Sequence, residues 1–287
     1  DSPALDSVDV FICNLADWRR PASGAAVDPE LGRIALPAGQ DPQRLVVSYS
    51  YGFGGDLGAS PAPRPAAEVR PPTWQVGVSL DHSAAGQEMI YTSLADAVQD
   101  WNALEPGHAG VIAIMDSRTH DLGNVPLEIE IKAGSQLLIV GAQWPAVPQA
   151  GAPGTFVRLP GRTELRGVRP CLAGSLAVKA NGRMGRLILD GLLLSGGVQV
   201  APGDLDGLAL RYCTLVPRVD TQTGDPLPSL AVKDCLRLAV TLERCVAGPL
   251  VIVDDVASLA IADSLLALPA GVVGLVVDAP LSPASIT

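Results

Sequence analysis

Apolar positions follow a helical spacing in only one stretch of this chain. There they recur at intervals of three or four residues, which predicts an amphipathic helix near residues 92–104 with a buried stripe of Leu94, Ala97, Val98, Trp101 and Leu104. Ser93 stands where its hydroxyl can cap the first turn, with Asp96 three residues later as a variant of the capping box. Elsewhere, short apolar or alternating runs broken by glycine and proline predict β-strands.

The strongest pattern is an internal repeat in the second half of the chain. Four segments begin with leucine, and their starts are separated by 21, 30 and 21 residues: Leu187, Leu208, Leu238 and Leu259. Polar turn formers between residues 218 and 225 account for the longer interval. The third positions also align, at Leu189, Leu210, Val240 and Ile261. A period of about 21 residues with short strands in each unit predicts a β-solenoid.

Three regions of the chain differ in composition and in the pattern of their apolar residues. Residues 1–57 hold short β runs and predict a small β-rich subdomain, with one strand face formed by Tyr49, Tyr51 and Phe53. Residues 58–73 are rich in proline and alanine, which predicts a semi-extended linker or a crossing over the surface. Residues 74–287 contain the helix and the repeat, and predict the solenoid domain.

The repeat and the segment Ser93-Leu-Ala-Asp-Ala-Val-Gln-Asp-Trp101 resemble the right-handed parallel β-helix superfamily, which has the pectin-lyase-like fold. The resemblance covers residues 90–287. It implies an all-β, single-stranded right-handed parallel β-helix of about 21 residues per coil, with the helix near 92–104 as its N-terminal cap. Residues 27–57 resemble a segment of uncharacterised large proteins that are associated with phage-tail-like contractile particles.

The composition agrees with a narrow solenoid interior. The chain is 48% hydrophobic but only 4% aromatic, and stacked coils bury columns of small aliphatic side chains among which large rings fit poorly. The formal net charge of −10 argues against nucleic-acid partners, which need a basic surface. We also expect no membrane span, because the uncharged run at residues 264–277 is shorter than the ~20 residues required.

The cysteine pattern and the two ends of the chain lead to two further predictions. The five cysteines, an odd number without a CxxC pair, predict buried reduced thiols rather than a disulfide scaffold or a zinc site. Because the first residue is Asp1 and a further coil would begin near Ser282, we expect the native protein to continue or another chain to cover the solenoid end. A cytoplasmic assembly and a cell-surface or extracellular particle both remain open.

Stacked acidic residues form the first candidate site. Asp204, Asp234 and Asp255 each precede a leucine start by four residues, with Asp206 and Asp254 beside them. One hypothesis is a calcium site, since carboxylate oxygens are the usual ligands of this ion; no other cofactor is expected. The alternative is that each aspartate stabilises the turn entering a strand by accepting hydrogen bonds from backbone N–H groups.

A second candidate is the pair formed by Asp190 and Arg211, which occupy the fourth positions of their segments and should lie one above the other. With Asp204 and Asp206, they are the candidate catalytic residues for the lyase or hydrolase activity that the resemblance allows. The alternative is an exposed ion pair between coils.

Histidines offer a weaker candidate. His108 and His120 flank the first β run of the solenoid domain, and His120 follows Asp116 and Ser117. No GxSxG motif accompanies them, so the sequence does not support a Ser–His–Asp triad.

The longest excursion between β runs is residues 142–170, which contains Trp144 and four arginines: Arg158, Arg162, Arg166 and Arg169. Either a basic patch that contacts a partner or a solvated loop would account for them.

These observations favour a non-enzymatic structural or adhesion module of a larger surface or phage-tail-like assembly. After residue 170 the only aromatic side chain is Tyr212, which leaves few platforms for sugar rings. The expected partners are other proteins, or further copies that bind through the solenoid end. The alternative is a polysaccharide lyase or glycoside hydrolase of the pectin-lyase-like fold, with a polysaccharide as ligand.

Overall fold

The protein divides into two compact units, Asp1–Phe53 and Gly54–Thr287. In the computed structural model, the described residues are 10–28, 33–40, 64–81, 89–152, 154–165, 167–268 and 275–277. The domain boundary predicted at residue 57 lies outside these residues, as do Tyr49, Tyr51 and Phe53.

The first unit contains a three-stranded sheet in the order β1-β2-β3. β1 (Val10–Ile12) is parallel to β2 (Ala25–Asp28), which is antiparallel to β3 (Arg33–Ala35). Leu15, Ala26 and Ala35 form a small core. The buried carboxylate of Asp28 accepts a hydrogen bond from the backbone N–H of Leu15 at 2.8 Å, which fixes the chain between β1 and β2.

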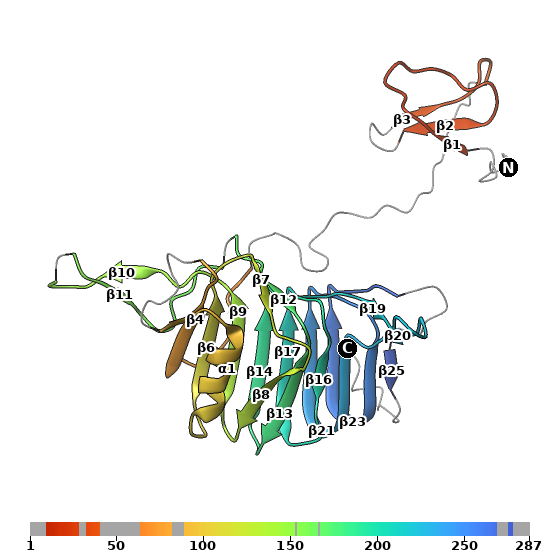
Figure 1. Ribbon diagram of the computed structural model, residues 1–287. Coiled ribbons are helices and arrows are strands. Elements are labelled where there is room, and N and C mark those ends of the chain that lie inside the picture. Colours follow the sequence, from red (N-terminus) through yellow and green to blue (C-terminus); the bar gives the residue numbers. More distant parts are fainter. Residues whose placement is uncertain are drawn as a thin grey trace. The chain divides into compact units, whose positions relative to one another are not determined.

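Almost all regular structure in the second unit is parallel β-strand, stacked in three rows that we call faces A, B and C (Figure 1). Face A contains β4 (Trp74–Val78), β5 (Ile90–Tyr91), β6 (Ala109–Ile114), β9 (Gln136–Gly141), β14 (Gly185–Asp190) and β17 (Leu205–Arg211). Face B contains β8 (Leu127–Lys132), β13 (Leu176–Asn181), β16 (Val198–Val200) and β25 (Leu275–Val277).

Two long strands, β21 (Leu230–Glu243) and β23 (Leu250–Ala262), pass from face B to face A and join them into one large parallel sheet. This sheet curls into a half-barrel (Figure 1). Face C closes the third side with β7 (Thr119–Asp121), β12 (Cys171–Ala173), β15 (Leu193–Leu194), β18 (Thr214–Leu215), β22 (Val246–Ala247) and β24 (Leu265–Leu266).

The chain visits the faces in a repeating order, B then A then C, for example through β13, β14 and β15 and again through β16, β17 and β18. This order is compatible with a β-helix. The prediction of a nearly all-β unit dominated by a large curled parallel sheet is therefore confirmed.

The strand register differs in one place from the predicted alignment. Leu187 pairs with Leu208, Leu208 with Val240, and Val240 with Leu259. The predicted partner of Leu208 was Leu238, two positions earlier. Side chains alternate along a strand, so a shift of two keeps the same side inward, and Leu238 and Val240 are both buried. The additional residues include an antiparallel pair, β19 (Arg218–Val219) and β20 (Pro226–Leu227).

Inward side chains form aliphatic columns along the stack. The clearest column follows the register of face A through Leu189, Leu210, Leu242 and Ile261. Its first three members are fully buried. Neighbouring parallel strands lie about 4.8 Å apart, so each side chain packs on its counterpart in the next coil.

The predicted helix is α1 (Leu94–Ala103), and Ser93 is its N-cap, with the Ser93 hydroxyl accepting a hydrogen bond from the N–H of Ala95 at 3.1 Å. Four residues of the predicted stripe are buried in the same core as the strand columns: Leu94, Ala97, Val98 and Trp101. The fifth, Leu104, follows the helix and is only partly buried. Trp101 donates its ring N–H to the carbonyl of Glu130 in β8 at 2.8 Å. No helix in the described part of the chain is long and apolar enough to cross a membrane.

A repeated bend joins face A to face C. Left-handed backbone occurs there at Gly191, Tyr212, Arg244 and Asp263. The next residue in three of these bends donates to a carbonyl of the preceding coil: Cys213 to Leu189, Cys245 to Leu210, and Ser264 to Leu242. Hydroxyl and thiol groups at these bends thus donate to backbone carbonyls of the neighbouring strand.

Candidate functional site

The outer surface of face A carries the candidate residues at positions 190 and 211. Register aligns its outward side chains in three columns across β9, β14, β17 and β21. The first outer column is Gln136, Arg186, Gly207 and Ala239. The middle outer column is Leu138, Ile188, Ala209 and Thr241. The charged column is Val140, Asp190, Arg211 and Glu243.

The charged column is a chain of ion pairs. Asp190 and Arg211 lie side by side, as predicted from their positions in the repeat, with Nη1 of Arg211 3.1 Å from Oδ2 of Asp190. The Nε atom of Arg211 lies 2.9 Å from Oε2 of Glu243 on the next coil. Asp190 is fully buried rather than exposed, because Arg64 covers its other carboxylate oxygen. The ion pairs of the charged column therefore link three neighbouring strands of face A, which are β14, β17 and β21.

Burial and charge act in opposite directions on these groups. Burial raises the pKa of the Asp190 carboxyl, and this effect exceeds the lowering by Arg64 and Arg211. Burial lowers the pKa of Arg211, but the hydrogen bond to Glu243 and the charge of Asp190 outweigh it, so the pKa is raised. The Asp190 carboxylate is therefore shielded from water and held between the guanidinium groups of Arg64 and Arg211, which suits a role in stability.

Arg64 is a member of this site that the sequence did not indicate. It belongs to the segment 64–73, which we call the crossing segment, and also donates to the carbonyls of Gly141 and Leu165. Its guanidinium passes against Gly191, where an added Cβ would collide with it. The equivalent position one coil later is Tyr212. The glycine at position 191, in place of a larger residue, is the sequence signal that could have indicated a side chain packed over this bend.

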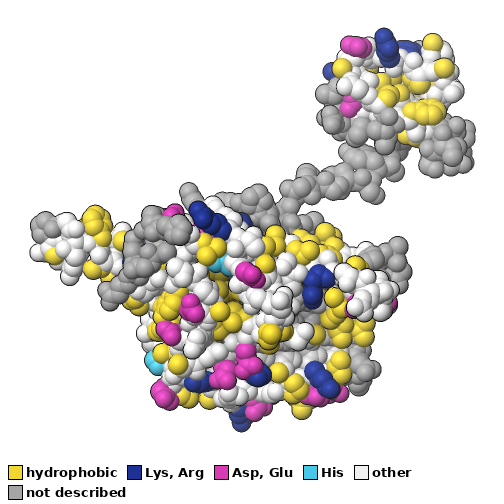
Figure 2. Space-filling view, viewed as in Figure 1, with side chains coloured by type: hydrophobic (Ala, Val, Ile, Leu, Met, Phe, Trp, Pro, Cys, Tyr) yellow, Lys and Arg dark blue, Asp and Glu magenta, His cyan; other side chains and the backbone are white. Residues whose placement is uncertain are grey.

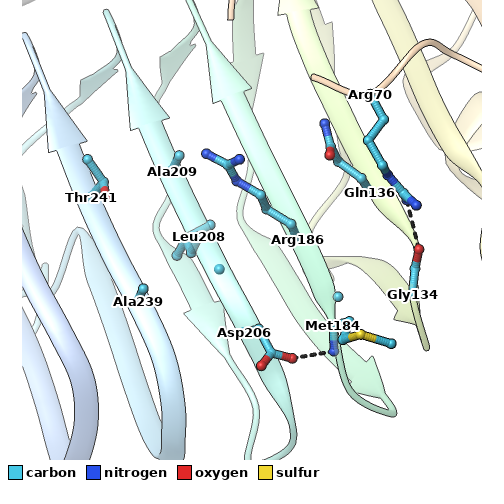
Figure 3. A pocket seen from close by; sticks show the side chains of 12 residues that line it. Arg70, Gly134, Gln136, Met184, Arg186, Asp206, Leu208, Ala209, Ala239 and Thr241 are labelled. Carbon is cyan, nitrogen blue, oxygen red and sulfur yellow. Dashed lines mark hydrogen bonds between the residues drawn. The ribbon is translucent and has the colours of Figure 1, made fainter. Parts of the chain in front are cut away.

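An open groove adjoins the charged column on face A, with a volume of about 490 Å³. Its floor consists mainly of small residues, including Gly207, Ala209 and Ala239. Figure 3 shows Arg186 extending over the sheet and Arg70 at the boundary of the groove. The absence of a side chain at Gly207 gives Arg186 its path, since a Cβ there would lie 3.1 Å from Cγ of Arg186.

Asp206 contributes the acidic edge of this groove. Its carboxylate accepts a hydrogen bond from the backbone N–H of Met184 (Figure 3). It also lies 3.4 Å from Nε of Arg237. Asp206 therefore holds two bends between faces B and A together. The groove contains this paired carboxylate and two arginine side chains, Arg70 and Arg186, so it carries net positive charge.

The stacked aspartates at positions 204, 234 and 255 are exposed at the bends from face B to face A. Asp234 and Asp254 have left-handed backbone, with φ angles of 49° and 67°. Among the described residues, no three His, Cys, Asp or Glu side chains gather in a way that could hold a metal ion. Left-handed backbone is common for aspartate in turns, so the position of Asp234 agrees with the alternative of a turn-forming residue.

Asp116 and His120 are brought together at the end of β6, with Nε2 of His120 3.0 Å from Oδ1 of Asp116. Asp116 also accepts hydrogen bonds from the N–H of Leu80 at 2.6 Å and from the hydroxyl of Ser79 at 3.2 Å. Ser117, the serine of the sequence candidate, donates to the carbonyl of Gly167 at 3.3 Å. Neither Ser117 nor Ser79 therefore donates to the imidazole of His120, as the serine of a catalytic triad would. His108 lies at the opposite end of β6 and contacts Thr73.

The excursion 142–170 forms a hairpin of β10 (Ala146–Pro148) and β11 (Phe156–Arg158), which projects from the stack (Figure 1). Trp144 anchors it, being fully buried and donating its ring N–H to the carbonyl of Leu159 at 3.0 Å. Arg158 lies 6.0 Å from the Trp144 ring, and Arg169 is half-buried. Arg162 is exposed, and Arg166 lies outside the described residues.

The cysteines are all unpaired. Cys213, Cys235 and Cys245 are buried, as expected, whereas Cys171 is half-buried and Cys13 is exposed. The buried thiols serve as hydrogen-bond donors to backbone carbonyls.

On the visible side of the second unit, acidic and basic side chains intermingle along its lower edge (Figure 2). Lys179 and Glu128, on adjacent strands of face B, illustrate this exposed pairing. Such pairs contribute little stability, and they leave this surface without one dominant sign of charge.

Comparison with known proteins identifies no relative. No protein-family model matches the chain, and no curated protein or solved structure does so either.

Proposed function

We propose that the second unit is a right-handed parallel β-helix with coils of about 21 residues and with α1 as its N-terminal cap. The repeating order of faces B, A and C supports this architecture, as do the coil-to-coil pairings of Leu187 with Leu208 and of Val240 with Leu259. The packing of α1 beside β8 supports a capping role. The handedness follows from the resemblance of the repeat to the pectin-lyase-like fold.

We infer that this β-helix is a structural or adhesion module of a larger surface or phage-tail-like assembly, and not an enzyme. The observation that carries the inference is the complete burial of Asp190 between Arg64 and Arg211. A carboxylate in this position stabilises the stack and cannot reach a substrate without breaking two ion pairs. Protein partners or further copies at the solenoid end would then provide the assembly.

The test combines an activity screen with a measurement of association. Neutral and anionic polysaccharides would be incubated with the full chain, with calcium and with chelator, and assayed for new reducing ends and unsaturated products. Sedimentation velocity over a range of concentrations would follow self-association. We expect no turnover and a concentration-dependent increase in sedimentation coefficient. Turnover that Asp190→Asn abolishes without unfolding the chain would contradict the proposal, as would a monomer at every concentration.

The open groove favours a second candidate, a polysaccharide lyase or glycoside hydrolase. Arg186 and Asp206 line the groove and are accessible there, unlike Asp190. If this candidate is correct, Asp206→Asn should remove turnover in the same screen while the chain stays folded, and Asp204→Asn, at an exposed position outside the groove lining, should not.

A further inference from the structure

The middle outer column of face A is apolar, and the crossing segment covers its first part. Val111, Leu138 and Ile188 follow one another in register across β6, β9 and β14. Ala67 and Val69 of the crossing segment pack against this cluster. This segment has no regular secondary structure and is rich in alanine and proline. The protein therefore already packs the apolar side chains of an irregular segment on this surface.

The groove is the continuation of the same surface beyond the crossing segment. The column proceeds to Ala209 and Thr241, both of which line the groove. Arg70 marks the junction, because it belongs to the crossing segment, lines the groove, and donates to the carbonyl of Gly134 at 2.7 Å. Small side chains on the floor leave room for a main chain to approach the sheet closely.

The charge of the groove selects among ligands. Asp206 is engaged by Met184 and Arg237. Within the part of the chain that the structure describes, the guanidinium of Arg186 has no hydrogen-bond or ion-pair partner. An arginine in this state provides a bidentate donor for a carboxylate. A ligand that combines small apolar residues with an acidic side chain would complement both the floor and the charge.

We propose that the groove binds an extended, alanine- and proline-rich peptide segment that carries an acidic residue, supplied by a partner protein. The segment would continue the surface that the crossing segment occupies, with its carboxylate paired to Arg186. This inference rests on the proposed role as an assembly module and names the chemistry of the partner. The apolar column and its existing peptide cover favour a peptide over a polysaccharide.

Fluorescence anisotropy with the full chain tests the proposal. The probe is a short fluorescein-labelled peptide of alanine, proline and valine with central glutamates, and the control peptide carries glutamine in their place. We expect the acidic peptide to bind and the control peptide to bind on the order of tenfold more weakly, as for loss of a charge-assisted hydrogen bond. Binding should also weaken as salt is raised.

Variants locate the binding surface. Arg186→Gln should weaken binding of the acidic peptide to the level of the control peptide, while Arg183→Gln, at an exposed arginine outside the groove, should leave it unchanged. Thr241→Trp should block both peptides by filling the floor. Circular dichroism and thermal unfolding would verify that each variant is folded.

Equal binding of the two peptides, no binding, or insensitivity to Arg186→Gln would overturn the proposal. Binding of an oligogalacturonate that depends on Arg186, in the absence of peptide binding, would overturn it in favour of a polysaccharide. A failure of peptide binding leaves the association measured by sedimentation unaffected, so the two proposals fail separately.

Discussion

At the scale of single residues, the charged side chains of face A act mainly on stability. Asp190 has an arginine on each side of its carboxylate, from the crossing segment and from the next coil. A buried ion pair is retained only when its desolvation is offset by good geometry and additional hydrogen bonds. The Nη2 atom of Arg64 adds such hydrogen bonds, to the carbonyls of Gly141 and Leu165.

Asp190→Asn should therefore destabilise the second unit strongly. The substitution leaves Arg64 buried without its counter-charge, and breaking such a pair from one side costs roughly 3–5 kcal/mol. Urea unfolding followed by circular dichroism would measure the loss. Glu243→Gln is the control, since Glu243 is partly exposed and its pairing with Arg211 contributes only about 1 kcal/mol or less. A small change in the free energy of unfolding for Asp190→Asn would show that these ion pairs do not stabilise the second unit.

Asp116 makes the stability of the protein depend on pH. Burial raises the pKa of its carboxyl, but hydrogen bonds from the N–H groups of Leu80 and Arg118 and the charge of His120 outweigh burial, so the pKa lies below its ordinary value. A carboxyl with a lowered pKa in the folded state contributes stability above its unfolded value, near about 4, and loses that contribution as the pH falls through the folded value.

Asp116→Asn should accordingly be less stable than the wild type at neutral pH, because an amide cannot accept the same set of hydrogen bonds. The difference between the two proteins should shrink as the pH falls below about 4. The measurement is the free energy of urea unfolding for both proteins at a series of pH values. A difference that stays constant down to the acid limit would show that the carboxylate form does not carry the stabilisation.

Sequence reasoning located some of these residues and missed others for a physical reason. The repeat placed Asp190 beside Arg211 because equal positions in successive coils must stack. It could not supply Arg64, which is 126 residues away in a segment without periodicity. The groove residues Gln136 and Thr241 were missed for a related reason, since polar residues on an outward strand face look alike whether they are solvated or line a groove.

At the scale of elements, α1 protects an edge of the sheet. The side chain of Asn102 donates to the carbonyl of Glu128 and accepts from the N–H of Glu130, both at 2.9 Å. β8 ends the strand order of the large sheet, so its backbone groups need such partners. The helix was predictable because its apolar spacing is unambiguous, whereas its bonding to β8 depends on tertiary placement.

Asn102→Ala should destabilise the second unit by about 1 kcal/mol, because both hydrogen bonds to β8 are lost at once while the helix itself gains propensity. Gln99→Ala, on the exposed side of the same helix, is the matched control and should have little effect. Thermal unfolding would compare the two variants. Increased aggregation of Asn102→Ala would further support protection of the edge, and equal stabilities of the two variants would contradict it.

The pairing register of β21 could not be predicted from the sequence repeat alone. The leucine starts suggested that Leu208 pairs with Leu238, but the strands pair Leu208 with Val240. Leu238 and Val240 are both apolar and share one side of the strand, so the hydrophobic pattern fits either alignment. An irregularity in β21 decides between them: three residues separate Cys235 from Ala239, whereas one residue separates their partners Val256 and Ser258 in β23. The sequence pattern alone does not fix the position of this irregularity.

At the scale of the whole molecule, the second unit is a stack in which each coil contacts mainly its neighbours. The column of Leu189, Leu210, Leu242 and Ile261 illustrates this, since a central member packs on two counterparts. Burial falls along the stack, from full burial at Leu210 to half-burial at Leu266 in β24. In a β-helix, which is the architecture that we propose for this unit, stability is approximately a sum of coil and interface contributions.

The cost of removing a leucine should therefore depend on its position in the stack. Leu210→Ala deletes a fully buried side chain between two coils and should destabilise by about 2–5 kcal/mol. Leu266→Ala removes the same atoms from a half-buried site and should cost below about 2 kcal/mol. Urea unfolding would give both values, and hydrogen exchange would show whether Leu266→Ala loosens only the coils near β24. Equal losses in the two variants would mean that the unit unfolds as a single globular core, and the stack would then not explain its stability.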